Sequence, residues 1–273
     1  GIRYYLPVNN NNKPEIATYI MRGAAGCKLA VELNAVTVVV DALRASATIA
    51  ALFAAGASEM LVVADEMDAR EAVKYYPDAL LIGERGGLKL PGFDVGNSPE
   101  EVAAYGDFSG KTIIFTSSNG AQRLTACRGA SAIAIGSVAN LCSISNWAKD
   151  ESERLQKPVV LISAGKFPDE NFISPEDDAS CACIAGEISL PIHADMSREY
   201  ELMCEDIKIN GLNQIFRTSK HALRLMEIGY GPDVTFCAQK DSYSSIPMVI
   251  GDAEIAGKII GVKLINYIRH VRK

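Results

Sequence analysis

Charged and small polar residues follow four apolar runs of this sequence, each directly after the run ends. One arginine side chain can bind two oxygens of a phosphate or sulfonate group at the same time. Main-chain N–H groups at a helix start bind the same anions, and small residues let the main chain approach closely. The residues concerned are Asp41 and Arg44, then Glu84, Arg85, Gly86 and Gly87, then Ser117, Ser118, Asn119 and Gly120, and last Ala164, Gly165 and Lys166, followed by Glu176, Asp177 and Asp178.

Carboxylates in such a set would repel an anionic ligand unless a divalent cation lay between them. Magnesium binds a few oxygen ligands together with water and substrate phosphate. Arginines, carboxylates and main-chain amides together therefore predict metal-assisted chemistry on a phosphorylated anion.

Structural roles alone could explain several of these residues. Asp41 could cap the next helix or pair with Arg44 across one turn. Ser117 or Ser118 could be a helix N-cap, and the acidic residues 176–178 could complement a helix dipole. The segment Glu84 to Gly87 is harder to explain in this way, because a charged pair beside paired glycines is more than a turn needs.

The spacing of apolar residues predicts elements that bring these positions together. The continuous β-branched run 36–40 is typical of a strand buried on both faces. Repeated strand–helix units predict α/β/α layers around a mostly parallel or mixed sheet, in one domain over 1–273 or in two closely packed halves, with the strand order open. Ligands bind at the carboxyl ends of such strands. The predicted strands are 36–40, 60–64, 79–82, 111–116, 132–135 and 159–163, and the predicted helices are 45–55, 66–75, 121–127, 140–156 and 177–188.

The two ends of the chain are less regular. We predict a helix from Pro14 to about Gly26, because proline suits a first helical turn. Towards the C-terminus we expect a helix over 213–228 and strands over 233–238 and 246–250. The apolar and basic tail 259–271 could be helix or strand, and could equally be a core element or an interface between copies of a homo-oligomer.

Composition excludes several classes of protein. The net charge of −6 argues against broad binding to nucleic acid or to anionic membranes. No segment approaches the roughly 20 apolar residues that a membrane span needs, and the first ten residues lack the order of a signal peptide. Seven cysteines without a CxxC pair indicate buried, reduced thiols and hence a cytoplasmic protein.

The sequence contains no other common motif that indicates a function. No GxSxG, HExxH, P-loop or GxGxxG pattern is present, which weakens acyl-transfer, zincin, kinase and dinucleotide-binding interpretations. His193, His221 and His270 are expected at ordinary surface or core positions.

Five blocks of the sequence resemble the 2-phosphosulfolactate phosphatase family, in the order in which that family carries them. They span about residues 36–250, and the second block is the most specific. The loop 167–173 looks longer than is usual for the family. The blocks are VVVDALRASATI, GERGGLKLPGFDVGNSPEE, TSSNGA, AGKFPDENFISPEDDASC and HALRLMEIGYGPDVTFCAQKDSYSSIP.

The resemblance implies a magnesium-dependent phosphatase that converts (R)-2-phospho-3-sulfolactate to 3-sulfolactate, a step of coenzyme M biosynthesis. On this basis we expect Asp41, Arg44, Glu84 and Arg85 to be catalytic, with Asp41 as nucleophile or general base. Water attack and a phospho-aspartate intermediate both stay open. The expected magnesium ligands are Asp41, Glu84, Asp177 and Asp178, and the expected substrate-binding residues are Arg44, Arg85, Gly86, Gly87, Asn97, Ser117, Ser118, Asn119 and Gly120.

Two alternatives accompany this interpretation. One is a phosphatase for another 2-phospho hydroxy acid, such as phospholactate or phosphoglycolate. The other is a non-catalytic binding protein for phosphorylated or sulfonated metabolites, which needs the arginines and the amides but no metal ligands.

Overall fold

Apolar, β-branched segments form the strands of a single ten-stranded sheet. The structure is a computed structural model and describes residues 16–267. The central strands are fully buried, as the continuous apolar runs predict. The strands are β1 (Thr18–Arg22), β2 (Val36–Val40), β3 (Glu59–Val63), β4 (Leu80–Arg85), β5 (Leu88–Lys89), β6 (Thr112–Thr116), β7 (Ala132–Ile135), β8 (Val159–Ser163), β9 (Pro247–Ile255) and β10 (Lys258–Asn266).

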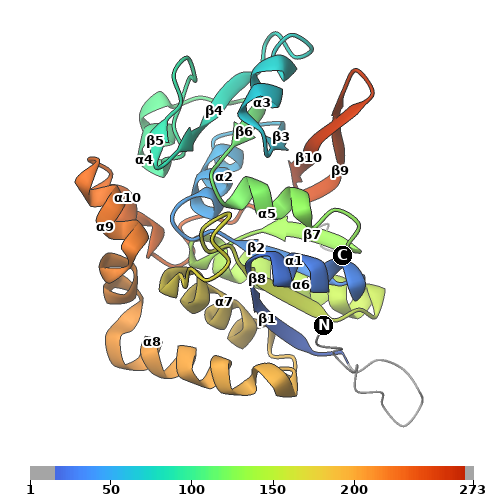
Figure 1. The fold of residues 1–273 in the computed structure, drawn as a ribbon, viewed down its shortest axis with the longest axis vertical. Helices are drawn as coiled ribbons and strands as arrows, with labels where there is room; N and C mark the ends of the chain where they lie inside the picture. Colours follow the sequence, from blue (N-terminus) through green and yellow to red (C-terminus); the bar gives the residue numbers. More distant parts are fainter. Residues whose placement is uncertain (1–15, 268–273) are drawn as a thin grey trace, which may run out of the picture.

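The strand order is β1-β8-β2-β7-β9-β10-β3-β6-β4-β5 (Figure 1). The strands β1, β8, β2 and β7 are parallel, and so are β3, β6 and β4. The antiparallel hairpin β9–β10 joins these two parallel groups, pairing with β7 on one side and with β3 on the other. The sheet is therefore mixed, and its continuity depends on the C-terminal hairpin.

Helices cover both faces of the sheet, and most of them lie between consecutive strands of the chain. Two short 3₁₀ segments, Val138–Asn140 and Ala194–Met196, precede longer helices. The helices are α1 (Gly23–Glu32), α2 (Ala45–Ala54), α3 (Glu66–Ala72), α4 (Pro99–Tyr105), α5 (Gly120–Ala126), α6 (Leu141–Leu155), α7 (Pro175–Ile188), α8 (Ser197–Thr218), α9 (Lys220–Glu227) and α10 (Gly231–Cys237).

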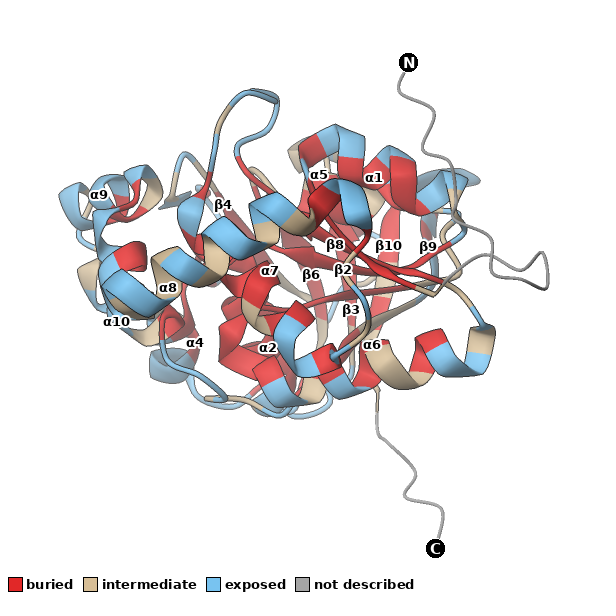
Figure 2. Ribbon diagram, turned by 90° about the horizontal axis from the view of Figure 1, so that it is seen from below, coloured by how far each residue is buried: buried red, intermediate tan, exposed pale blue. Residues whose placement is uncertain are grey.

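Alternating side chains of the central strands pack into different layers of the core. On β2, Val39 joins a cluster with Leu124 of α5, whereas Val38 joins a cluster with Trp147 of α6 and Ile184 of α7. Successive side chains of a strand point to opposite faces, so both faces must be covered. Figure 2 shows the buried strands between helices whose outer sides are exposed. The predicted α/β/α layering is confirmed; the division into domains stays a prediction.

The predicted helix from Pro14 to Gly26 is wrong over the described residues. Thr18–Arg22 is β1, which pairs in parallel with β8, and α1 begins only at Gly23. Tyr19 and Ile20 are buried in opposite core clusters, which is the period of a strand. Positions 14 and 15 of the predicted helix lie outside the described residues.

The last third of the chain also differs from the sequence prediction. The predicted helix 213–228 is the end of α8 and the whole of α9, separated at Ser219, whose hydroxyl caps α9. The predicted strand 233–238 is helix α10 instead, because Pro232 suits its first turn and Val234 and Cys237 are buried three positions apart. Within the described part of the tail, Lys258–Asn266 is a strand, and positions 268–271 lie outside it.

The fold carries the predicted functional positions to one region. Within each parallel group the strands end at the same edge, so the loops after β2 and β8 lie together, and so do those after β4 and β6. The three antiparallel pairings of the hairpin make the two groups run in opposite directions, and residues from both sets of loops line one cavity. None of the helices formed by residues 16–267 combines the length and the apolar character of a membrane-spanning helix.

The close contact between β10 and β3 gives a test of this architecture. A Cβ atom on Gly261 would lie 1.9 Å from the main-chain oxygen of Val62, so Gly261→Ala must push the two strands apart. We expect a loss of about 2–4 kcal/mol in the free energy of unfolding, measured by urea denaturation. Gly251→Ala on β9 is the control, because no atom lies within 4 Å of its Cβ position. Equal midpoints for the two variants would contradict this account of the hairpin.

Candidate active site

A cavity of about 570 Å³ opens at the carboxyl ends of the strands. Eight of the residues singled out as site residues from the sequence line it, and they come from segments up to 78 positions apart, from Asp41 to Asn119. The cavity also contains residues that the sequence analysis did not assign to the site, among them His221, which it expected at an ordinary position. The eight are Asp41, Arg44, Glu84, Gly86, Gly87, Asn97, Ser118 and Asn119, and the other lining residues are Leu43, Lys166, Phe167, Phe172, Lys220, His221, Arg224 and Leu225.

Asp41 is a buried carboxylate held by the start of a helix. The N–H of Gly120, the first residue of α5, donates to Oδ2 at 2.8 Å. Asp41 therefore contacts the start of α5 rather than capping α2 or pairing with Arg44. Within residues 16–267 its other oxygen has no hydrogen-bond partner. Burial raises the pKa of Asp41 to about 6, opposed by the charge of His221 and supported by that of Glu84.

Glu84 accepts hydrogen bonds from the main chain that follows it, and this turn requires the two glycines. Its Oε1 accepts a hydrogen bond from the Ser118 N–H at 2.7 Å. Its Oε2 accepts from the Gly87 N–H at 2.7 Å and from the Ser118 hydroxyl at 3.0 Å. Gly86 and Gly87 have φ angles of 60° and 90°, which let the main chain turn back on this carboxylate. The amides expected to bind phosphate thus bind the protein's own carboxylates.

Arg85 and Ser117 lie outside the cavity lining. Successive side chains of a strand point in opposite directions, and Glu84 and Arg85 are neighbours on β4. Arg85 therefore donates to the Thr116 hydroxyl and the Ala64 carbonyl on the other side, both at 3.0 Å. The hydroxyl of Ser117 accepts from Ala121 in the first turn of α5. The structure thus places both residues in support of the loops, which corrects their expected position in the pocket.

Asp177 and Asp178 also lie outside the lining. Both oxygens of Asp177 accept main-chain hydrogen bonds, from Ala42 at 2.8 Å and from Gly165 at 3.0 Å. Burial raises the pKa of Asp177 well above its ordinary value. Asp178, one position along α7, forms an ion pair with Arg22 at 2.8 Å. The four carboxylates expected around magnesium therefore do not converge.

The oxygens left for a metal are few. Among residues 16–267, no group of three or more His, Cys, Asp or Glu side chains could hold a metal ion. In the cavity lining, Asp41 keeps one oxygen without a partner, and the side-chain oxygen of Asn97 is buried without one. Magnesium is commonly bound by one or two carboxylates together with water and substrate phosphate. A magnesium ion shared with the substrate would have these two side chains as its protein ligands.

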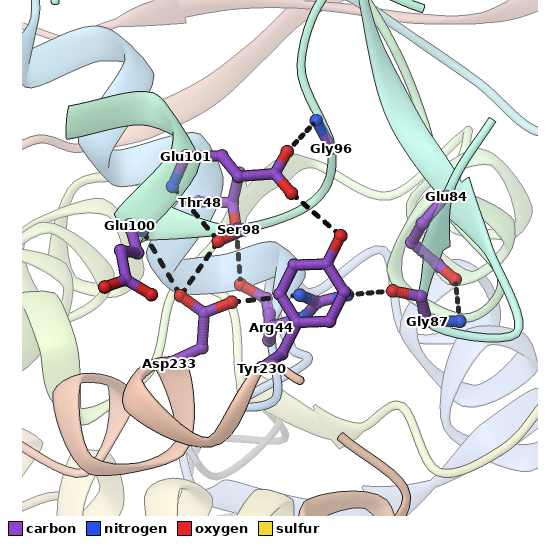
Figure 3. Close-up of polar contacts among 10 residues, drawn as sticks. All are labelled: Arg44, Thr48, Glu84, Gly87, Gly96, Ser98, Glu100, Glu101, Tyr230 and Asp233. Carbon is purple, nitrogen blue, oxygen red and sulfur yellow. Dashed lines mark hydrogen bonds and ion pairs between the residues drawn. The ribbon is translucent and has the colours of Figure 1, made fainter. Parts of the chain in front are cut away.

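Arg44 forms a buried ion pair (Figure 3). Its Nη1 donates to Asp233 of α10 at 2.9 Å, and its Nη2 donates to the Gly87 carbonyl at 2.6 Å. The guanidinium also lies over the ring of Tyr230, 4.3 Å from its centroid. Both ends of the fork are used by the protein, so Arg44 holds the glycine loop in place.

Asp233 extends this contact to the loop after β4. Its second oxygen accepts from the Ser98 hydroxyl at 2.9 Å and from the Glu100 N–H at 3.2 Å (Figure 3). The Tyr230 hydroxyl donates to Glu101 at 2.8 Å. The sequence analysis missed Asp233 because it assigned 233–238 to a strand. The order Ser98-Pro99-Glu100-Glu101 is a helix-start signal that could have predicted α4.

Three cationic side chains line the cavity in addition to Arg44. Lys166 follows β8, and Lys220 and Arg224 lie four positions apart on α9. The Nζ atoms of Lys166 and Lys220 lie 5.8 and 5.7 Å from the centroid of Phe172. Neither lysine forms an ion pair within the described part of the chain. The spacing of Lys220 and Arg224 on one helix face was a signal available in the sequence.

The geometry defines an α/β protein with a cationic cavity built around a buried carboxylate. Comparison of the sequence with known proteins identifies its family. The family model for 2-phosphosulpholactate phosphatase matches residues 25–252. The chain belongs to that family, as its sequence blocks predict, and the expected enzyme class is confirmed at the level of the family.

Several similar proteins carry the name probable 2-phosphosulfolactate phosphatase. One from Carboxydothermus hydrogenoformans is 35% identical, over 77% of this chain and 84% of its own length. One from Thermotoga petrophila is 32% identical, over 78% and 88%. One from Deinococcus radiodurans is 30% identical, over 82% and 92%.

Removing the partner of Arg44 tests the buried ion pair. Asp233→Ala leaves a guanidinium that is 2% exposed without its counter-charge. We expect a loss of about 3–5 kcal/mol in the free energy of unfolding, measured by urea denaturation. The control Asp252→Ala removes the exposed partner of Arg128 and should cost less than about 1 kcal/mol. Equally small losses would contradict the structural importance of the buried pair.

The raised pKa of Asp41 predicts a pH-dependent stability. An acid whose pKa is raised on folding binds its proton more tightly in the folded state, so its ionisation destabilises that state as the pH rises from about 4 to about 6. Without divalent ions, Asp41→Asn should be about 1–3 kcal/mol more stable than the wild type at pH 8, and about equal at pH 4. Asp195→Asn, at an exposed carboxylate, is the control. A pH-independent difference would contradict the assignment.

Proposed function

We propose that this protein is a magnesium-dependent phosphatase that converts 2-phospho-3-sulfolactate to 3-sulfolactate and phosphate. One observation carries the proposal: a buried carboxylate with a raised pKa shares a cavity with cations that form no ion pair with residues 16–267. The carboxylate is Asp41, and the cations are Lys166 and Lys220. The names of the relatives support this substrate, and the reaction would belong to the coenzyme M pathway.

The cations give the cavity its substrate preference. A phosphoryl group and a second anionic group each need positive charge, and Lys166, Lys220 and Arg224 supply it at the wall. A ligand with a sulfonate or a second acid group uses these side chains better than a neutral phosphoester does. The same reasoning admits phospholactate and, with fewer contacts, phosphoglycolate.

Asp41 acts at the phosphorus centre. Its free oxygen either attacks phosphorus or takes the proton of an attacking water, and the raised pKa favours both roles at neutral pH. The Gly120 N–H holds the other oxygen, so the carboxylate is oriented before substrate binds. Magnesium, held by Asp41 and Asn97, would neutralise charge on the phosphoryl oxygens. A pure binding protein would have no use for a buried carboxylate facing its anionic ligand.

We also propose a cytoplasmic setting. All seven cysteines are unpaired in the structure, which supports a reducing, cytoplasmic setting.

Phosphate release from 2-phospho-3-sulfolactate tests the function directly. We expect turnover with Mg²⁺ and a loss of about 10²-fold or more after EDTA treatment, restored by added Mg²⁺. Phospholactate and phosphoglycolate form the comparison panel, and the substrate with two further acidic groups should have the highest kcat/KM.

Two outcomes would contradict the proposal. If EDTA leaves ligand binding intact and no divalent ion supports hydrolysis of any substrate in the panel, the protein is a binder. If phospholactate is hydrolysed with a higher kcat/KM than the sulfonated substrate, the assigned substrate is wrong while the phosphatase class stands.

A further inference from the structure

An imidazole–carboxylate pair forms part of the cavity wall, and the proposed function so far leaves it unused. His221 lines the cavity at the start of α9. Its Nδ1 lies 2.8 Å from Oε1 of Glu176, in the first turn of α7. The His221 ring stacks on Phe172 with a centroid separation of 4.8 Å. Two contacts therefore fix the ring, and Nε2 is the nitrogen left without a hydrogen-bond partner among residues 16–267.

The burial of Glu176 favours a positive charge on the neighbouring imidazole. Glu176 has no exposed surface, and its Oε2 has no hydrogen-bond partner within the described residues. A buried carboxylate with one unpartnered oxygen is costly unless a positive charge lies beside it. A protonated His221 supplies that charge. Burial lowers the pKa of His221, but the hydrogen bond to Glu176 and the charge of Asp41 outweigh it, and the pKa is raised.

Hydrolysis of the phosphoester requires a group that can donate a proton to the leaving oxygen. When the P–O bond of an aliphatic phosphoester breaks, its electron pair stays on an alkoxide oxygen, which is a poor leaving group until it is protonated. Lysine and arginine hold their protons too tightly to serve at neutral pH. A histidine beside a buried carboxylate is shifted towards its protonated form and can still release its proton.

We propose that His221 is a catalytic residue that donates its Nε2 proton to the leaving alkoxide oxygen, and that Glu176 is the positioning residue that orients it. This inference rests on the proposed function. Phosphorus gains a bond to the attacking oxygen and loses its bond to the ester oxygen, which leaves as the hydroxyl of the product. The water that completes the hydrolysis supplies the proton that returns to the imidazole.

The position of the pair supports this role over a purely structural one. Asp41 and His221 line the same cavity, and each charge affects the protonation of the other. The attacking group and the proton donor thus come from different elements, the loop after β2 and α9, and both line the cavity of about 570 Å³. A structural ion pair would not need its imidazole to line a cavity.

The test compares two leaving groups. Replacing His221 by Gln removes the proton donor but keeps a polar side chain of similar length. We expect kcat for 2-phospho-3-sulfolactate to fall by about 10²–10⁴-fold. The fall for 4-nitrophenyl phosphate should be less than about tenfold, because nitrophenolate leaves without a proton. His193→Gln is the control, since His193 is also buried but stacks on Tyr19 instead of lining the cavity.

A second variant covers the case in which His221→Gln does not fold. Glu176→Gln removes the negative charge beside the imidazole, so the alkaline limb of the kcat profile should move to lower pH. Circular dichroism checks that the fold is retained. The other charged groups that face His221 stay in place in this variant; they are Asp41 after β2, Lys166 after β8, and Lys220 and Arg224 on α9.

Each result separates the two proposals. Equal losses on both substrates in His221→Gln, or an unmoved alkaline limb in Glu176→Gln, would overturn the role of His221 and leave the phosphatase function standing. A wild-type protein that hydrolyses neither substrate with any divalent ion would refute the proposed function, and this inference with it.

Discussion

The buried ion pair between Arg44 and Asp233 is the constraint on which the site depends. Arg44 follows β2, Asp233 belongs to α10, and their contact is almost completely shielded from water. A charge at such a position is tolerated only with its partner and its hydrogen bonds complete. The pair meets this condition by binding the Gly87 carbonyl on one side and the Ser98 hydroxyl on the other. It therefore joins the C-terminal helices, the glycine loop and α4 into one wall of the cavity.

Main-chain amides at the strand ends hold carboxylates instead of leaving them in solvent. Asp41, Glu84 and Asp177 each accept at least one N–H group from a loop or a helix start. The partial positive charge of a helix start stabilises an anion, and the protein uses this to fix acidic side chains next to one another. The hydrogen bond from Gly120 holds one oxygen of Asp41, and the other oxygen has no hydrogen-bond partner among the described residues. Burial keeps the pKa of this carboxyl raised. This combination suits a group that must react at neutral pH.

The cavity brings together residues from both parallel groups of strands. Asp41 and Lys166 follow β2 and β8 of one group, whereas Glu84 lies in β4 and Ser118 follows β6 of the other group. The hairpin β9–β10 sets the spacing between these groups, and α9 adds Lys220 and His221 from the side. Membership of the 2-phosphosulpholactate phosphatase family and a cavity with this charge arrangement are consistent with one another.

The sequence by itself determined the layered fold and which strand ends carry the site residues, because buried parallel strands leave long apolar runs followed by polar loops. It also identified Asp41 and Glu84 as neighbours. The tertiary structure decided that the ends of two oppositely directed groups of strands meet at one cavity. Only the tertiary structure decided the direction of each side chain: Arg85 turns away because strand residues alternate, and Asp178 turns to Arg22. It alone revealed Asp233 and His221 as contacts of the site and paired Glu176 with His221. Their partners lie between 45 and 189 positions away in the chain, and local spacing carries no information on such pairs.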